Sequence, residues 1–137
     1  MRETITEQLA EFIEKCSFST IPDEVIFCAK GYILDFLGVA LPGSRAESNR
    51  IMADLIMDFG GKNESVIIGY PKKVSCLNAA LANGTIGHAL ELDDDHRTSA
   101  LHPGVAIIPA ALAICEKEKV EGKTFLSAVV AGYEVMT

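Results

Sequence analysis

The sequence predicts an all-α protein, a bundle of several helices with at most one short strand. Apolar residues recur with the helical period of three to four residues along most of the chain. Residues 65–69 are the only strand-like run and are too short to found a sheet without partners. With 137 residues, the chain is long enough for one domain with a real core. We therefore predict a single helical domain over residues 1–137.

The first half of the chain predicts three helices, over residues 4–16, 22–43 and 46–59. Thr4 and Glu7 have the spacing of a capping box at the start of the first helix. Pro22 opens the second, because its fixed φ suits the first helical turn and its missing N–H costs nothing there. Gly60 and Gly61 stop the third. Each helix therefore has a local signal at one end.

The second half predicts three more helices, over residues 75–87, 103–117 and 124–135. The first of these is rich in Ala and Gly, which predicts close packing against a neighbouring helix. Its helical pattern of apolar residues can be continued to Leu92. Either Pro103 or Pro109 opens the next, and Thr124 is expected to cap the last. That last helix is still apolar where the chain stops at Thr137. We therefore expect the chain to be a piece of a longer protein.

Composition and charge exclude some classes of function. The net charge is −7 and no basic run is present, which argues against nucleic acid as a partner. No uninterrupted apolar run reaches the roughly 18 residues that span a membrane, so no membrane partner is expected. The mean hydropathy of +0.25 is slightly high for this size. It suggests that another domain or subunit covers part of the apolar surface.

The cysteines and the N-terminus predict a cytoplasmic protein. The four cysteines lie far apart and form no Cys-x-x-Cys pair, so a zinc site or redox motif is unsupported. Their apolar surroundings predict buried free thiols, which are typical of a reducing compartment. Residues 1–8 lack the apolar core of a signal peptide.

Residues 83–104 carry most of the functional information, because they hold all three histidines, four acidic residues and an arginine. If the helix that begins near residue 75 persists to Asp95, Glu91 and Asp95 lie about 40° apart on one face. His88 then lies one turn earlier on the same side. Two carboxylates beside an imidazole suit general acid/base chemistry, since an imidazole exchanges protons near neutral pH.

Each of these residues also has a simpler interpretation. Asp93 and Asp94 can be solvated or interact with the dipole of the following helix. His88 can hold a neighbouring turn by a hydrogen bond, and His96 can be an ordinary loop residue. Arg97 either neutralises the adjacent aspartates or binds a substrate carboxylate, and the sequence favours neither. A carboxylate/imidazole metal site is a weaker alternative.

Several motifs resemble the N-terminal part of the MmgE/PrpD family, which includes 2-methylcitrate dehydratase, cis-aconitate decarboxylase and an iminodisuccinate epimerase. The resemblance covers nearly the whole chain. It is strongest where Asn-Gly is followed by His-Ala-Leu, an acidic run and then His-Pro-Gly. The matching segments are residues 35–38, 43–44, 65–69, 79–95, 102–104, 109–114 and 132–135.

The resemblance implies which residues form the active site. The family's first aspartate, its threonine and its later histidine correspond to Glu91, Asp95 and His102, and of these only His102 matches in type. We therefore predict His102, Glu91 and Asp95 as catalytic. Arg97, His88 and Asn83 are the predicted substrate-binding residues, and no metal and no cofactor are expected.

By resemblance, the chain is the truncated N-terminal part of the large helical domain of a two-domain enzyme. The implied activity is that of a lyase or isomerase, 2-methylcitrate dehydratase-like or cis-aconitate decarboxylase-like. It acts on a small di- or tricarboxylate by acid/base proton transfer. The expected partners are this substrate, a missing C-terminal lid domain or partner chain, and a second copy in a homodimer. The chain alone is expected to be inactive. The alternatives are a non-catalytic helical remnant or interaction module and a metal-binding helical protein.

Overall fold

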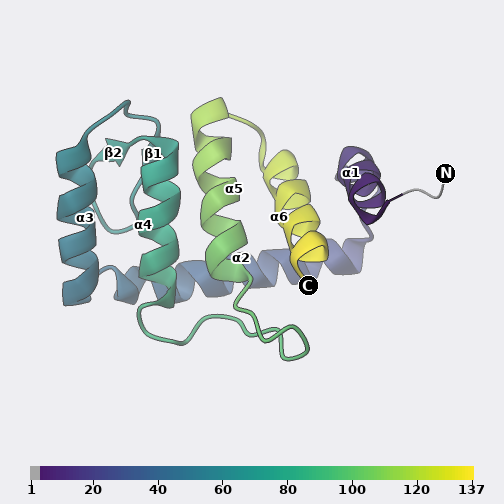
Figure 1. The fold of residues 1–137 in the computed structure, drawn as a ribbon, viewed down its shortest axis with the longest axis horizontal. Helices are drawn as coiled ribbons and strands as arrows, with labels where there is room; N and C mark the ends of the chain where they lie inside the picture. Colours follow the sequence, from purple (N-terminus) through teal and green to yellow (C-terminus); the bar gives the residue numbers. More distant parts are fainter. Residues whose placement is uncertain (1–3) are drawn as a thin grey trace.

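The computed structural model describes residues 4–137 and confirms the all-α prediction (Figure 1). The described residues form six helices and one small antiparallel sheet. The helices are α1 (Ile5–Lys15), α2 (Asp23–Gly43), α3 (Glu47–Phe59), α4 (Cys76–His88), α5 (Gly104–Glu118) and α6 (Gly122–Met136). The strands are β1 (Ser65–Val66) and β2 (Lys73–Val74), with Ser65 opposite Val74. Residues 1–3, the start of the segment tested for a signal peptide, lie outside the described residues.

Four helices, α3 to α6, stand side by side in a row, and α2 runs across one end of them (Figure 1). One face of α2 contacts α4, α5 and α6, while α1 lies beyond α6. The core lies where α2 meets the row and between the row and the sheet. Its largest fully buried apolar side chains are Phe36, Ile56, Ile67, Ile86, Ile108 and Val129.

Three helix ends with local chemical signals lie where the sequence predicts. The Glu7 N–H donates to Thr4 Oγ1 at 3.2 Å and the Thr4 N–H donates to the Glu7 carboxylate at 2.7 Å, so the capping box is confirmed. Gly60, with φ of 66°, ends α3. Pro103 precedes α5, so it, rather than Pro109, opens that helix.

Close packing of α4 against α5, predicted from the small residues of α4, is confirmed. A Cβ on Gly87 would lie 2.6 Å from the Phe36 ring of α2 and 3.2 Å from Val105 of α5. A Cβ on Gly84 would lie 2.8 Å from the Val105 carbonyl oxygen. That carbonyl has no N–H partner four residues later, because the residue there is Pro109. Because Gly84 has no side chain, α4 can pack closely against the turn of α5 in which Pro109 removes one backbone hydrogen bond.

Several predicted boundaries and burial states are wrong. The strand over residues 65–69 covers only Ser65–Val66. The helix α4 ends at His88 and does not continue to Leu92. Thr124 does not cap α6, because α6 begins earlier, at Gly122, with Glu121 in the capping position. Cys28 is exposed, Cys76 is buried, and Cys16 and Cys115 are partly exposed, so the prediction of buried thiols holds only for Cys76.

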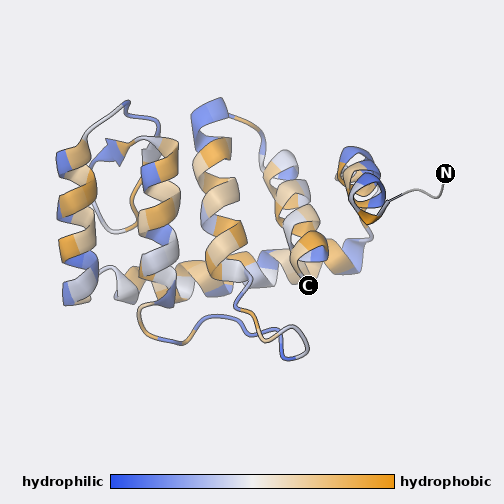
Figure 2. Cartoon of the chain, in the orientation of Figure 1, coloured by the Kyte–Doolittle hydropathy of each residue, from blue (hydrophilic) through white to orange (hydrophobic). Residues whose placement is uncertain are grey.

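The side of α2 that faces away from the row carries an exposed apolar strip, here called the outer α2 strip. It consists of Phe27, Gly31, Leu34, Gly38 and Leu41, which repeat at four- and three-residue steps and therefore share one side of the helix. Phe27 is 78% exposed and Leu34 72%. Apolar residues therefore occur on both the buried and the exposed side of α2, which is hydrophobic along much of its length (Figure 2).

Among residues 4–137, α2 is the one helix long and apolar enough to cross a membrane by length and composition alone. Lys30 and Asp35 interrupt its apolar run, as the sequence indicates. Core helices of water-soluble domains also reach this length and hydropathy, and one such helix is weak support for a membrane span. The absence of a membrane partner stays a prediction.

Candidate functional site

The loop between α4 and α5, residues 89–103, folds back so that its two ends meet. The helix α4 ends at His88, and Glu91 adopts a left-handed backbone with φ of 50°, which turns the chain. Farther along, the His96 N–H donates to the Leu101 carbonyl at 2.8 Å and closes a narrow turn. The chain therefore returns to the end of α4, and His102 lies beside His88 at the start of α5.

Asp93 lies between these two histidines. Its Oδ2 is 3.0 Å from the Nδ1 of His88 and 3.0 Å from the Nδ1 of His102. The two rings pack edge to face with centroids 5.1 Å apart. The Asp93 side chain is only 2% exposed, whereas those of His88 and His102 are 49% and 42% exposed. The carboxylate is thus buried behind two imidazoles that reach the surface.

Both imidazoles line a groove of about 590 Å³ between α3, α4 and α5. The other lining residues are Ser48, Asn49, Ala80, Leu81, Gly84, Thr85, Ala89, Val105 and Ala106. Among these described lining residues there is no Lys or Arg. Asn49 is fully buried and donates from Nδ2 to the Gly43 carbonyl at 2.7 Å, while its Oδ1 has no hydrogen-bond partner among the described residues.

Asp94 has a structural role at the start of α5. The Gly104 N–H donates to Asp94 Oδ1 at 2.9 Å and the Tyr133 hydroxyl of α6 donates to Oδ2 at 2.7 Å. Burial, followed by the hydrogen bond to Asp94, raises the pKa of the Tyr133 hydroxyl well above its ordinary value. The expected interaction with the following helix is therefore confirmed for Asp94. For Asp93 the expectation of a solvated or helix-associated side chain is wrong, because its carboxylate is buried against two histidines.

The structure does not bring the three predicted catalytic residues together. His102 lines the groove, Glu91 is exposed on the turn, and Asp95 lines a different cavity of about 520 Å³. That second cavity lies between α2, the end of α6 and the loop, next to His96 and Tyr133. The expectation that Glu91 and Asp95 share a helical face is wrong because α4 ends at His88. The catalytic roles of Glu91 and Asp95 stay predictions.

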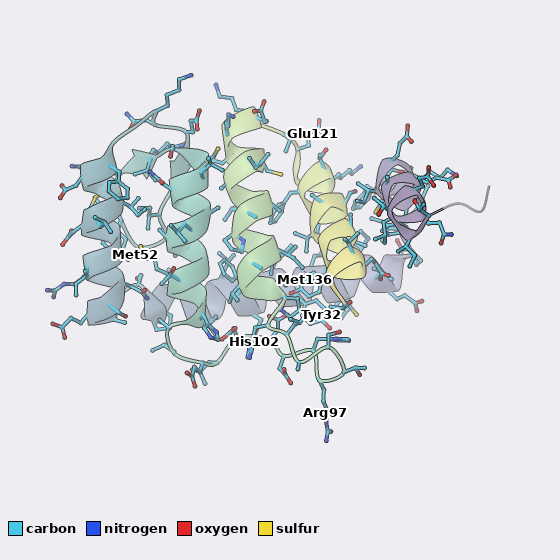
Figure 3. All side chains as sticks on the ribbon, in the orientation of Figure 1. Tyr32, Met52, Arg97, His102, Glu121 and Met136 are labelled. Carbon is cyan, nitrogen blue, oxygen red and sulfur yellow. The ribbon has the colours of Figure 1, made fainter. Side chains whose placement is uncertain are left out.

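The predicted substrate-binding residues are also dispersed. His88 lines the groove, but Arg97 lies on the tip of the loop and points away from the helices (Figure 3). Asn83 is 1% exposed and uses both polar atoms inside the protein. Its Oδ1 accepts from the Ile68 N–H at 2.8 Å and its Nδ2 donates to the Val66 carbonyl at 2.9 Å, which ties α4 to the segment after β1.

Sequence patterns missed Asp93, which contacts the two histidines of the groove, and Asn49, which lines the groove. Asp93 follows His88 by five residues, a spacing that helical periodicity does not pair, because the contact forms only after the chain has turned. The proximity of two histidines and an acid in one loop was the available signal. Asn49 gave no signal, since an asparagine in the first turn of a helix is common.

His88, Asp93 and His102 also have the arrangement of a metal site. One ligand atom from each lies within 4.8 Å of the others. Two imidazole nitrogens and one carboxylate oxygen suit zinc or iron better than magnesium. A hydrogen bond between the His88 ring and Asp93, together with the ion-pair contact of His102 with Asp93, explains the same distances. The absence of a bound metal stays a prediction.

Comparison with known proteins identifies the family. Residues 7–137 match the MmgE/PrpD N-terminal domain. The chain is 32% identical over 137 residues to the cis-aconitate decarboxylase-like protein oryM of Aspergillus oryzae (strain ATCC 42149 / RIB 40) and 29% identical over 135 residues to the cis-aconitate decarboxylase of Aspergillus terreus. Each alignment covers 95% of this chain and 28% of the relative, so the chain spans less than a third of their length. The family match, over nearly the whole chain, shows that the chain belongs to the MmgE/PrpD family and corresponds to its N-terminal domain.

Proposed function

We propose that this chain is the N-terminal helical part of a lyase that acts on a small di- or tricarboxylate, and that the reaction is a decarboxylation like that of cis-aconitate. The names of the two relatives favour decarboxylation over the dehydration that the family also includes. The observation that carries the proposal is the His88–Asp93–His102 cluster at the edge of a groove. It places proton-carrying side chains where a small molecule has access.

A decarboxylation needs a proton donor close to the carbon that loses carbon dioxide. The bond from that carbon to the leaving carboxylate breaks, and its electron pair stays on the carbon. The carbon then takes a proton from Nε2 of a protonated imidazole, carbon dioxide leaves, and the neutral ring regains a proton from water. In the proposal His102 is this donor, because it lines the groove and matches the family's histidine.

The substrate's carboxylates also need cations, and among the described groove residues only the two histidines can provide a positive side chain. The N-terminus of α5, with Val105 and Ala106 in the groove wall, adds the partial positive charge of a helix dipole. These groups favour binding of an anion, but they are too few to balance the two or three negative charges of a di- or tricarboxylate. We therefore propose that a further segment or partner chain completes the site with basic residues.

The proposal is tested by expressing the chain alone and within the longer protein that carries it. Carbon dioxide release from cis-aconitate is measured for both. The longer protein is expected to turn over, and the isolated chain is not. In the longer protein, His102→Ala should lower kcat/KM by about 100-fold or more, the range for loss of a general acid. His96→Ala is the matched control. Equal losses in both variants would refute the role of His102.

Zinc binding is a second function that the cluster geometry favours, since its three ligand atoms lie close enough for one ion. Calorimetric titration of the chain with zinc, manganese and magnesium separates the two functions. Stoichiometric zinc binding that is lost in Asp93→Ala would support the metal site. No heat at millimolar metal would remove it and leave the acid/base function.

We further propose that a second copy of the chain covers the outer α2 strip. Its large residues lie seven residues apart, and Gly31 and Gly38 lie between them. Such a row of ridges and gaps can pack against an identical antiparallel helix, with a two-fold axis relating the copies. Light scattering after size exclusion tests this. Leu34→Glu should give a monomer, whereas Leu77→Glu, at an equally exposed leucine of α4, should not. A monomeric parent chain would refute the second copy.

A further inference from the structure

We propose that, in the longer protein, the segment that directly follows Thr137 docks into the second cavity and places a Lys or Arg side chain against its carboxylates. This cavity, of about 520 Å³, lies between α2, the end of α6 and the loop. Its described lining residues include none of those that line the groove. The inference rests on the longer protein of the proposed function, but it does not depend on the reaction or on the histidine cluster.

Thr137 forms part of the wall of this cavity. Its N–H and its hydroxyl both donate to the Tyr133 carbonyl, at 3.0 and 2.8 Å, and its carbonyl accepts from the Ser99 hydroxyl at 3.1 Å. These bonds hold Thr137 between α6 and the loop, at the end of α6 that crosses α2 (Figure 1). In the longer protein, the residues after Thr137 therefore begin at the cavity.

The relatives extend far beyond the part that this chain matches. The alignments cover only 28% of the cis-aconitate decarboxylase-like protein and of the cis-aconitate decarboxylase. Because residues 7–137 match an N-terminal domain, we expect most of the remaining chain to follow Thr137. Ten extended residues span up to about 35 Å, and a compact volume of this size is about 10 Å across, so a short segment is long enough to cover it.

Three exposed acidic residues line the cavity, one from each of the elements around it. Glu24 lies on α2, Asp95 on the loop and Glu134 on α6. None of the three forms an ion pair with a residue that the structure describes. The described lining residues also include no Lys or Arg. A segment that covered these carboxylates without a cation would take them out of water unpaired, which is unfavourable. It follows that the segment carries positive charge.

The two tyrosines of the cavity are a second feature that suits a cation. The Tyr32 ring of α2 and the Tyr133 ring of α6 stack with centroids 5.0 Å apart and planes 12° from parallel. Tyr32 is 46% exposed (Figure 3). Lys and Arg cations bind over tyrosine faces, and their apolar stems pack on the same rings. Arg suits the cavity better than Lys, because its planar guanidinium both stacks on a ring and binds a carboxylate through two hydrogen bonds.

A second copy of the chain is a less suitable occupant. The proposed interface between copies is the outer α2 strip, and the described lining of the cavity includes no residue of that strip. Packing of two copies through the strip therefore leaves the cavity open. The strip also brings only apolar residues and glycines, so it does not supply the cation that the cavity needs.

Cys28 lines the cavity and is exposed in this chain, so it reports whether the cavity is covered. Its rate of reaction with an aromatic disulfide reagent is measured by peptide mass spectrometry in the chain and in the longer protein. We expect a rate about 10-fold or more lower in the longer protein, because the reaction needs access to the thiol. Cys76, which is buried, should stay unreactive in both and shows that each is folded. An equal Cys28 rate in both proteins would refute the docking.

Variants of the longer protein identify the occupant. Replacing by Gln every Lys and Arg among the first ten or so residues after Thr137 should raise the Cys28 rate by about 3-fold or more, because the charge pairs are lost. Glu24→Gln with Glu134→Gln should do the same. Glu47→Gln with Asp58→Asn, at two exposed acids of α3, removes the same charge and should change nothing. Each rate is divided by that of the same acidic variant in the isolated chain, which corrects for the charge beside the thiol. A segment with neither Lys nor Arg would refute the proposal directly.

Leu34→Glu, which should separate the two copies, is expected to leave Cys28 of the longer protein protected. A rise in its rate would assign the protection to a second copy and overturn the proposal. Protection that persists in both charge variants would assign it to a different segment, with the same consequence. None of these measurements uses turnover. A longer protein that releases no carbon dioxide would therefore refute the proposed function and leave the docking result unchanged.

Discussion

Tyr133→Phe is expected to lower the free energy of unfolding by about 1–2 kcal/mol. The substitution removes the hydrogen bond of 2.7 Å from the Tyr133 hydroxyl to Asp94 and leaves the ring, which stacks on Tyr32 with centroids 5.0 Å apart. A hydrogen bond to a charged group contributes about 1.5–3 kcal/mol. The lower part of that range applies, because Asp94 keeps the Gly104 N–H and both partners are partly exposed. For a chain of this size the expected decrease in Tm is about 3–6 °C.

The contribution of Tyr133 to the free energy of unfolding should also depend on pH. The pKa of Tyr133 is raised in the folded protein, mainly by burial, so the folded state keeps its proton where the unfolded state loses it. Its contribution to stability is full below the ordinary tyrosine pKa of about 10 and is lost as the pH rises above it toward the folded value. For one proton the slope is at most about 1.4 kcal/mol per pH unit, and partial exposure reduces it.

Urea unfolding followed by circular dichroism at pH 8 and near pH 11 measures both effects. At pH 8 the parent chain should be the more stable, and its advantage over Tyr133→Phe should shrink near pH 11. Tyr70→Phe is the control for loss of a neutral hydrogen bond, since the Tyr70 hydroxyl donates to the Ser44 carbonyl at 3.1 Å. An advantage that is absent at pH 8, or that grows with pH, would show that Tyr133 does not hold Asp94 as the structure indicates.

Three further outcomes test the packing. Asn83→Ala leaves the buried Ile68 N–H and the partly buried Val66 carbonyl without their side-chain partner and should cost about 2–4 kcal/mol in urea unfolding. A cost below about 1 kcal/mol would contradict the role of Asn83 in holding α4 to this segment. Gly87→Ala, whose Cβ would lie 2.6 Å from the Phe36 ring, should cost about 1–3 kcal/mol, and an unchanged Tm would contradict the close contact of α4 with α2. In the native chain Cys28 should react rapidly with an aromatic disulfide reagent and Cys76 only after unfolding, and the reverse order would contradict their burial.

The starts of α1 and α2 were predictable from local signals, whereas the expected cap at Thr124 was wrong for α6. The capping box of Thr4 and Glu7 and the proline before α2 act within one turn of the chain, so the residues themselves determine the boundary. The end of α4 was not predictable in this way. Residues 89–92, Ala-Leu-Glu-Leu, continue the helical period, and no local signal stops them. In the structure Asp93 binds two histidines, one of them nine residues later, and this contact competes with the helix.

The candidate site was predictable only in part, because some of its contacts form only in the folded chain. His102 could be identified from the motif that it shares with the family, and the structure places it at the groove. Glu91 and Asp95 were paired by assuming a continuous helix, and the turn at Glu91 separates them. Asn49 comes from α3, and only the folded arrangement of α3 beside α4 brings it to the groove.

The acidic run explains how the loop is held. Three adjacent carboxylates repel one another on a solvated turn, but here each side chain has different surroundings. Asp93 binds the histidines at both ends of the loop, Asp94 binds the start of α5 and Tyr133 of α6, and Asp95 is exposed. Two neighbouring residues therefore fix the site relative to three helices. It follows that a change at Asp94 should move His102 as well, because His102 is two residues before Gly104, whose N–H Asp94 accepts, and its ring contacts Asp93.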